Sequence, residues 1–182
     1  DYLRGLEWDG EPRSDFFLER YFGATAPLDG DHATSYLRLV SARWLIGTAA
    51  RALTPGCKMD NVLVLEGPEG VKKSSALKAL GRPWFAECQI DVTNKDTKML
   101  AGTNWIIELP ELAAFKRSET EAQKAFFSTS EDKFRPPYGS AIEVFPRHCV
   151  FVGTTNELED YLPSMNGNRR FWPIHCSDDI YV

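Results

Sequence analysis

The stretch EGPEGVKKSS, residues 66–75, holds the residue types that could bind the phosphates of a nucleotide. Lys73 and Ser74 follow Gly67 at the spacing of the motif G-x-x-x-x-G-K-[ST]. In this motif the lysine reaches the terminal phosphates, the hydroxyl binds Mg²⁺, and backbone N–H groups at a helix N-terminus face the anion. We therefore predict a nucleotide-binding loop formed by Gly67, Pro68, Glu69, Gly70, Val71, Lys72, Lys73, Ser74 and Ser75.

Lys72 departs from this motif, because it stands where the second glycine is expected. A lysine there costs about 1 kcal/mol or more if the backbone needs the conformation that glycine allows. It also places a second cation near the phosphates. Two outcomes are open: the loop binds ATP with lower turnover, or it has lost its nucleotide and kept a role in oligomerisation or DNA binding.

Two acids lie at the end of a second apolar run, WIIELPEL, residues 105–112. An acid at the end of a buried strand is costly unless it is paired or faces a cation. We assign Glu108 to Mg²⁺ coordination together with Ser74, and Glu111 to the role of catalytic base, with the two roles interchangeable. The alternative is two solvated acids at a strand end.

Polar residues in the last third of the chain could complete such a site. Asn156 ends the apolar run HCVFVGTTN and could orient an attacking water molecule. Arg169 and Arg170 precede the apolar run FWPI. They either form local salt bridges or act as an arginine finger, which stabilises transition-state charge on the nucleotide of a neighbouring subunit.

The elements that must position these residues can be read from the apolar pattern. Short continuous apolar runs predict buried parallel strands, and apolar residues at helical spacing predict helices. We expect strands at 61–66, 103–109, 148–156 and 169–176, and helices at 14–23, 32–53, 73–81 and within 111–127. Ser14 is expected to cap the first helix, and Gly23 and Gly81 to end the first and third. This order predicts an α/β parallel sheet flanked by helices.

Two further segments complete the prediction. Residues 131–147, EDKFRPPYGSAIEVFPR, form a projecting β-hairpin around a proline turn. Residues 1–56 form a small N-terminal helical region, in which Trp8, Asp9 and Arg13 serve packing, and residues 57–182 form the core, whose C-terminal part is expected to be truncated.

Composition excludes several classes of protein. The chain of 182 residues has a net charge of −5, so any contact with nucleic acid must use a local patch. It has no apolar run long enough to span a membrane and no visible signal peptide, so a cytoplasmic location is expected. The four cysteines are far apart, which argues against zinc and a disulfide framework.

Several blocks of the sequence resemble the virulence-associated protein E family, whose members belong to prophages and other mobile elements and are often fused to or paired with a primase. The blocks run in order along nearly the whole chain: GLEWDGEPR, RALTPGCKMDNVLVLEGPEG, IIELPEL, FRPPYG, VFVGTTN and GNRRFWPI. The family is related to superfamily 3 helicases, which are AAA+-like ring-forming ATPases. The resemblance implies a P-loop NTPase fold and ATP-dependent, Mg²⁺-dependent DNA unwinding in mobile-element replication.

The resemblance also implies residue roles. Lys73 and Ser74 match Walker A, Glu108 and Glu111 match Walker B, and Asn156 matches sensor 1. Arg169 or Arg170 would act across the interface of a homo-oligomeric ring, such as a hexamer.

In superfamily 3 helicases, the interval that here holds the hairpin carries a β-hairpin that grips single-stranded DNA. Lys133 and Arg135 could contact phosphates, and Tyr138 could stack on a base. The alternative is a rigid proline turn with two solvated cations. A primase, separate or fused, is the other partner that the resemblance implies.

Overall fold

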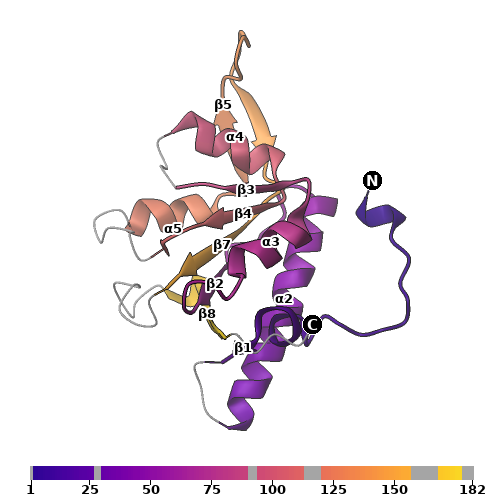
Figure 1. Cartoon of the computed structure of the whole chain (residues 1–182). Coiled ribbons are helices and arrows are strands. Elements are labelled where there is room, and N and C mark those ends of the chain that lie inside the picture. Colours follow the sequence, from indigo (N-terminus) through magenta and orange to yellow (C-terminus); the bar gives the residue numbers. More distant parts are fainter. Residues whose placement is uncertain (1, 27–29, 90–93, 113–119, 157–167, 178–182) are drawn as a thin grey trace.

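A six-stranded sheet forms the centre of the computed structural model, which describes residues 2–26, 30–89, 94–112, 120–156 and 168–177 (Figure 1). The strand order is β1-β8-β2-β7-β4-β3. The strands are β1 (Ala24–Thr25), β2 (Val62–Glu66), β3 (Phe85–Glu87), β4 (Ile106–Leu109), β7 (Val150–Thr155) and β8 (Phe171–Cys176). All neighbours are parallel except β1, which runs antiparallel to β8. The predicted α/β class is confirmed, and the predicted parallel sheet is found except at β1.

Helices cover both faces of this sheet, and the alternation of side chains along β2 shows how. Leu63 and Leu65 pack in one core cluster with the helices α1, α2 and α3, whereas Val62 and Val64 pack in the other cluster with α4 and α5. The helices are α1 (Phe17–Phe22), α2 (Asp31–Leu53), α3 (Lys73–Gly81), α4 (Lys95–Thr103) and α5 (Thr120–Ser128). Two 3₁₀ turns, η1 (Leu3–Gly5) and η4 (Asn168–Arg170), precede α1 and β8.

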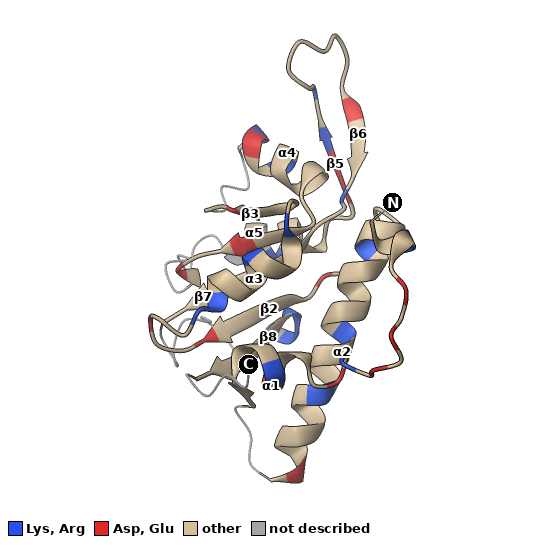
Figure 2. Cartoon of the chain, turned by 45° about the vertical axis from the view of Figure 1, so that its right-hand side comes forward, with Lys and Arg blue, Asp and Glu red and all other residues tan. Residues whose placement is uncertain are grey.

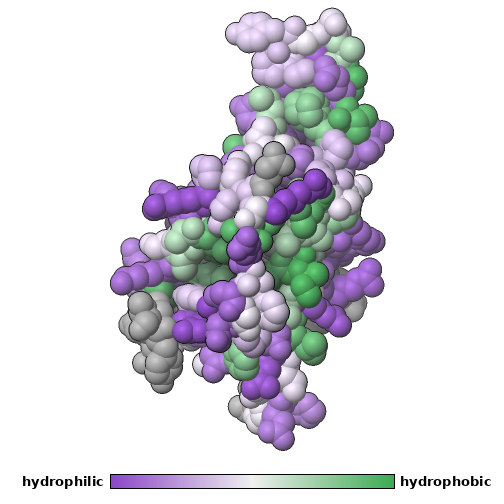
Figure 3. Space-filling view, turned by 90° about the vertical axis from the view of Figure 1, so that its right-hand side faces the viewer, coloured by the Kyte–Doolittle hydropathy of each residue, from purple (hydrophilic) through white to green (hydrophobic). Residues whose placement is uncertain are grey.

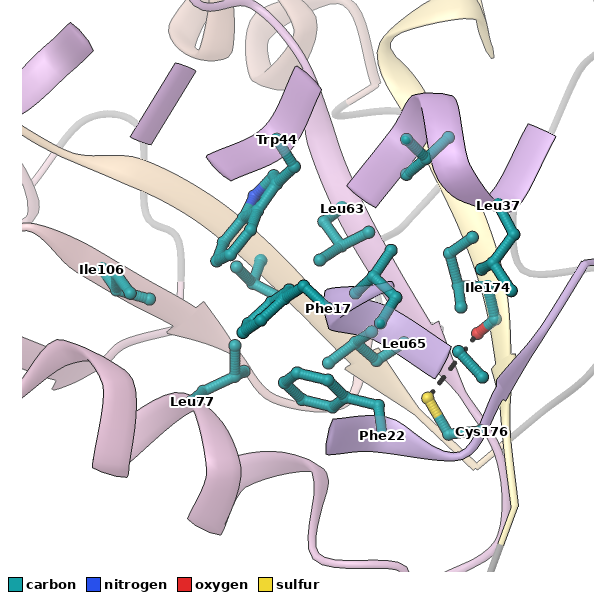
Figure 4. Packing of buried hydrophobic residues seen from close by; sticks show 14 of the residues in the cluster. Phe17, Phe22, Leu37, Trp44, Leu63, Leu65, Leu77, Ile106, Ile174 and Cys176 are labelled. Atoms are coloured by element: carbon teal, nitrogen blue, oxygen red, sulfur yellow. Dashed lines mark hydrogen bonds between the residues drawn. The ribbon is translucent and has the colours of Figure 1, made fainter. Parts of the chain in front are cut away.

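Aromatic side chains join the N-terminal helices to the sheet (Figure 4). The ring of Phe17 in α1 stacks on Trp44 in α2, with ring centroids 5.9 Å apart. Both side chains lie in the cluster that contains Leu63 and Leu65 of β2. Burying a side chain of this size contributes about 2–3 kcal/mol. The N-terminal helices therefore share a core with the sheet, while the division of the chain at residue 56 stays a prediction.

Several predicted elements differ in detail. The first helix begins at Phe17, and the Ser14 hydroxyl hydrogen-bonds the Asp15 carboxylate, so the prediction of a Ser14 cap is wrong. Gly23 ends this helix in the left-handed conformation, as expected. Gly81 lies inside α3 as its last residue, and a Cβ there would come within 3.1 Å of the Phe85 Cβ. Close packing therefore explains Gly81 better than helix termination does.

The N-terminal arm, residues 6–13, does not pack as predicted. Trp8 is 78% exposed. The Arg13 guanidinium donates two hydrogen bonds to Asp9, at 2.8 and 2.7 Å, and thereby lowers the pKa of that carboxyl to about 2. The arm thus closes on itself, and the predicted packing role is wrong for Trp8.

The predicted hairpin is confirmed. It consists of β5 (Glu131–Phe134) and β6 (Glu143–Pro146), which pair antiparallel and stand clear of the body of the molecule (Figure 1). Of the predicted helical segment 111–127, residues 120–127 lie in α5, and residues 113–119 lie outside the described part of the chain. Within the described residues, none of the helices combines the length and apolarity needed to cross a membrane. All four cysteines are free.

Candidate phosphate-binding site

The loop between β2 and α3, residues 67–72, is bent by backbone conformations that favour glycine. Gly67 has φ +146° and Gly70 has φ +95°. A Cβ on Gly67 would collide with the backbone carbonyl oxygen of Cys176 in β8. These two positions therefore require glycine, and the bend brings the loop back over the N-terminus of α3. We call residues 67–72 the glycine loop.

Lys72 lies at the N-cap of α3 with φ 58° and ψ 25°, in the left-handed region. This is a conformation that a residue with a Cβ adopts at a cost of about 1–2 kcal/mol. No side-chain cap hydrogen bond is present at this N-cap. The motif's glycine is therefore favoured here by the backbone itself, and the side chain of Lys72 is exposed.

Lys73, the next residue, is turned inward and is only 8% exposed. Its ammonium donates hydrogen bonds to the carbonyl oxygens of Gly67 and Pro68, at 2.5 and 2.9 Å, and to Asn156 Oδ1 at 3.5 Å. Burial lowers the pKa of Lys73, and Cys176, Glu108 and Glu69 oppose this shift. The ammonium thus lies inside the glycine loop, where an incoming anion would find it.

Glu108 in β4 connects this loop to the middle of the sheet. Its Oε1 accepts hydrogen bonds from the hydroxyls of Ser74, at 2.5 Å, and Thr154, at 2.7 Å. The side chain is 1% exposed, and among the described residues its Oε2 has no hydrogen-bond partner. A buried carboxylate oxygen without a partner is costly, and a cation would satisfy it.

The oxygen atoms at this position fit Mg²⁺. Mg²⁺ is commonly held by one or two protein oxygens together with substrate phosphates and water, rather than by a cage of side chains. Ser74 Oγ and Glu108 supply such oxygens, and no group of three or more His, Cys, Asp or Glu residues is gathered in the described parts of the chain. The donor set therefore suits a metal that arrives with a phosphate ligand.

A cavity of about 360 Å³ opens over the glycine loop. Asn156 and Glu111 line it from the ends of β7 and β4, and Glu111 is exposed with φ 54°. The structure thus brings Glu111 and Asn156 together with the loop. The other lining residues are Glu69, Gly70, Val71, Lys72, Lys73, Ser74, Ser75, Pro110, Thr154 and Thr155.

A second, larger cavity of about 850 Å³ adjoins the first and shares Gly70, Val71, Lys72 and Ser75 with it. Its remaining walls are largely apolar and come from α1, α2 and α3. They are Phe17, Tyr21, Phe22, Leu45, Ala76, Ala79 and Leu80, with Arg13 from the N-terminal arm. Sequence reasoning missed this cavity; the aromatic residues of FFLERYF were the available signal.

Sequence reasoning also missed a contact beside the loop, between Glu66 and His175. Glu66, the last residue of β2, is buried, and its Oε2 lies 2.6 Å from Nε2 of the half-buried His175 in β8. This pair exists because β2 and β8 are neighbours, in a register that places Glu66 opposite His175.

Arg169 and Arg170 are not brought to the cavity of their own chain. They precede β8, whose first residue, Phe171, pairs with the first residue of β2, whereas the glycine loop follows the last. The length of β2 separates them from the loop by roughly 15 Å. Arg170 Nε donates to Ser128 Oγ at 2.9 Å, and the Arg169 carbonyl accepts from Asn61 at 3.4 Å.

The three hairpin residues predicted to contact DNA are exposed. Tyr138 is fully exposed at the turn, and Lys133 lies 3.4 Å from Glu131 on the same strand. The charge view shows cations and acids together on the hairpin arms (Figure 2). The tip therefore offers Arg135 and Tyr138 more directly than Lys133.

A buried ion pair holds the foot of the hairpin. Arg147 donates to both carboxylate oxygens of Asp132, at 2.6 and 2.9 Å, and the two side chains are 1% and 5% exposed. The same guanidinium donates to the Phe126 carbonyl in α5 and lies 4.0 Å from the centre of the Phe126 ring. The last turn of α5 thus fixes the hairpin to the sheet.

Fold and site together define a mixed α/β protein with a glycine loop at the carboxyl end of a central parallel strand. The chain belongs to the virulence-associated protein E-like domain family, whose sequence model matches residues 3–182. The predicted resemblance is thereby confirmed. No curated protein is similar enough in sequence to match the chain.

Among solved structures, the chain is similar to the C-terminal region of NrS-1 in its apo state. One such structure, of residues 305–718, gives a TM-score of 0.52 at 16% identity and covers 77% of this chain and 35% of that one. An A-form structure of the same region gives 0.51 at 14% identity, with 79% and 36% covered. This chain spans about a third of those chains, and the likeness shows the fold alone.

Proposed function

We propose that this chain is a P-loop ATPase that drives DNA unwinding in the replication system of a phage or other mobile element. The observation that carries the proposal is the contact between the glycine loop and β4. Ser74 and Glu108 share a short hydrogen bond there, beside the buried ammonium of Lys73, and the second oxygen of Glu108 is left without a described partner. Residues with no phosphate or metal to bind would have no physical need for this arrangement.

ATP binding would exchange partners within the site. The Lys73 ammonium, held by two backbone carbonyls, would move its hydrogen bonds to phosphate oxygens, which are stronger acceptors because they are charged. Backbone N–H groups at the start of α3 would face the same phosphates. Bound Mg²⁺ would neutralise phosphate charge, and Ser74 and Glu108 are the residues placed to hold it.

Two residues on the rim of the cavity are placed for the attacking water. Glu111 could accept its proton, and the Asn156 amide could orient it. Asn156 also contacts Lys73, at 3.5 Å, so its orientation would respond to the phosphate that Lys73 binds.

The larger cavity favours a whole nucleotide over a simple phosphate. It is contiguous with the glycine loop and has apolar and aromatic walls of the kind that bind flat ring systems. We place the adenine base there, against the helices α1 and α3.

DNA contact is assigned to the hairpin. It projects from the body, exposes Tyr138 fully and carries Arg135 near its tip. Stacking of a base on Tyr138 with phosphate contacts from Arg135 and Lys133 is the mode in which single strands bind without sequence preference. Repeating the hairpin around a ring of subunits would concentrate positive charge in a protein whose overall charge is −5.

A second candidate function rests on Lys72. Its strained backbone and exposed side chain are compatible with a loop that no longer turns ATP over, leaving a module that oligomerises and binds DNA. A primase, fused or separate, stays a proposed partner in both cases.

ATP hydrolysis with and without single-stranded DNA tests the proposal. We expect Lys73→Ala to abolish nucleotide binding, and Glu108→Gln to bind ATP while losing turnover by about 10²-fold or more. Lys78→Ala, an exposed lysine of α3, is the matched control and should behave like wild type. Tight Mg²⁺-dependent ATP binding would overturn the second candidate, and a lack of turnover by clean wild-type protein with DNA would count against the ATPase proposal. No ATP binding by folded wild-type protein would overturn the ATPase proposal.

A further inference from the structure

The face of α2 that points away from the sheet carries a second apolar stripe. It consists of Leu39, Ala42, Ile46, Ala49 and Leu53, which follow one another in alternating steps of three and four residues. This is the spacing of the a and d positions in a helix–helix seam. We call these five residues the α2 seam.

The seam lies opposite the buried face of the same helix. Leu37, Trp44 and Arg51 are buried against the sheet, and each precedes a seam residue by two positions, which turns it to the far side of the helix. Leu39, Ile46 and Leu53 are 54%, 65% and 44% exposed.

Single exposed apolar residues are normal, but a stripe that continues over about 21 Å of one helix is not explained by chance exposure. The space-filling view shows apolar, green atoms gathered over α2 beside the N-terminal arm (Figure 3). That arm runs next to α2 in Figures 1 and 2 and itself exposes Leu6 and Trp8. Apolar side chains of two segments therefore adjoin one another without covering one another.

The charges beside the α2 seam indicate what kind of helix would bind there. Arg38 and Arg43 are exposed beside the seam, and the only acid in α2 is Asp31, at its first residue (Figure 2). A second copy of α2 would bring the same cations and no acids. A parallel pair would place Arg38 against Arg43, and an antiparallel pair would leave both without acids. An acidic flank on the incoming helix would pair with them.

We propose that the α2 seam docks an amphipathic α-helix of a partner protein, with apolar a and d positions and acidic flanks. The proposal concerns a surface remote from Glu108 and the glycine loop. It therefore does not depend on ATP binding.

A synthetic three-heptad peptide with Leu at a and d and Glu at e and g is the probe, fluorescein-labelled and followed by anisotropy. We expect it to bind wild-type protein and to lose at least tenfold in affinity for Ile46→Glu, because a charge would enter the centre of the seam. Thr34→Glu, an exposed change on the same helix outside the seam, should bind like wild type. The same peptide with Lys at e and g should bind wild type at least tenfold more weakly than the Glu peptide does. In Arg43→Glu, the difference in affinity between the two peptides should be smaller.

Equal binding of the peptide to wild type and to Ile46→Glu would overturn the proposal. Sedimentation velocity supplies the second measurement. If wild type self-associates and Ile46→Glu does not, a second copy occupies the seam and the proposal is wrong. Circular dichroism checks that each variant is folded. Measuring ATP turnover of Ile46→Glu as well shows whether a failure of peptide binding and a failure of the proposed ATPase activity are separate.

Discussion

Lys72 shows how one residue can carry a cost that its neighbours create. The carbonyl oxygen of Cys176 leaves no room for a Cβ on Gly67, and Lys73 is held inward by two carbonyls of the loop. Lys72, the last residue of the loop, must therefore turn through the left-handed region, and it has a Cβ.

Replacing Lys72 by glycine should stabilise the protein. Relief of the left-handed strain is worth about 1 kcal/mol, which corresponds to a rise in Tm of roughly 2–4 °C for a chain of this size. Thermal unfolding of wild type and Lys72→Gly measures this change in Tm. Lys72→Ala removes the same charge but keeps a Cβ, so it should give no comparable gain; an equal rise in both variants would assign the effect to the charge.

At the scale of the element, the hairpin depends on its foot more than on its own strand pairing. Two strands alone are marginally stable in water. The buried pair of Arg147 and Asp132, joined to α5 through the Phe126 carbonyl, supplies the attachment.

Asp132→Ala should therefore destabilise the protein by about 3–5 kcal/mol, because it leaves the buried guanidinium of Arg147 without its counter-charge. Urea unfolding gives the free energy. Glu131→Ala removes the neighbouring exposed acid, which pairs with Lys133 at the surface, and should cost less than about 1 kcal/mol. Similar losses in the two variants would mean that the buried pair is not the anchor.

Elements with strong local signals could be predicted from the sequence. Strands β2, β4, β7 and β8 are short apolar runs, and they were found where expected. Strand β3 and helix α4 were missed, because Phe85–Glu87 is an edge strand of three residues and Lys95–Thr103 has few apolar side chains. In the candidate site, the meeting of Ser74 with Glu108 follows because the carboxyl ends of parallel strands lie at one edge of the sheet, here with β7 between β2 and β4. The pair of Glu66 and His175 does not, since it depends on a register between distant segments.

At the scale of the whole molecule, different candidate functional residues lie at the two ends of the parallel strands. The glycine loop, Glu108 and Asn156 gather at the carboxyl ends of the parallel strands. The turn with Arg169 and Arg170 lies at the opposite end. If either arginine acts on a nucleotide, that nucleotide belongs to another subunit.

Mixing two inactive variants tests this arrangement. Lys73→Ala should no longer bind a nucleotide in its own glycine loop, and Arg170→Ala should lack the arginine finger. Each variant alone should therefore be nearly inactive. In an equimolar mixture about a quarter of the interfaces would pair an intact loop with an intact arginine, and ATP turnover should partly recover. No recovery from subunits shown to co-assemble would mean that Arg170 is not a finger in trans.

The last turn of α5 has a consequence for how such an assembly would work. Its Phe126 carbonyl holds the foot of the hairpin through Arg147, and its Ser128 hydroxyl holds Arg170. A neighbour's phosphate that drew Arg170 away from Ser128 would act on the same last turn of α5 that holds the hairpin through the Phe126 carbonyl. The position of the hairpin in one subunit would thereby depend on the nucleotide bound by the next subunit. Helix α5 would couple the nucleotide site to the segment proposed to contact DNA.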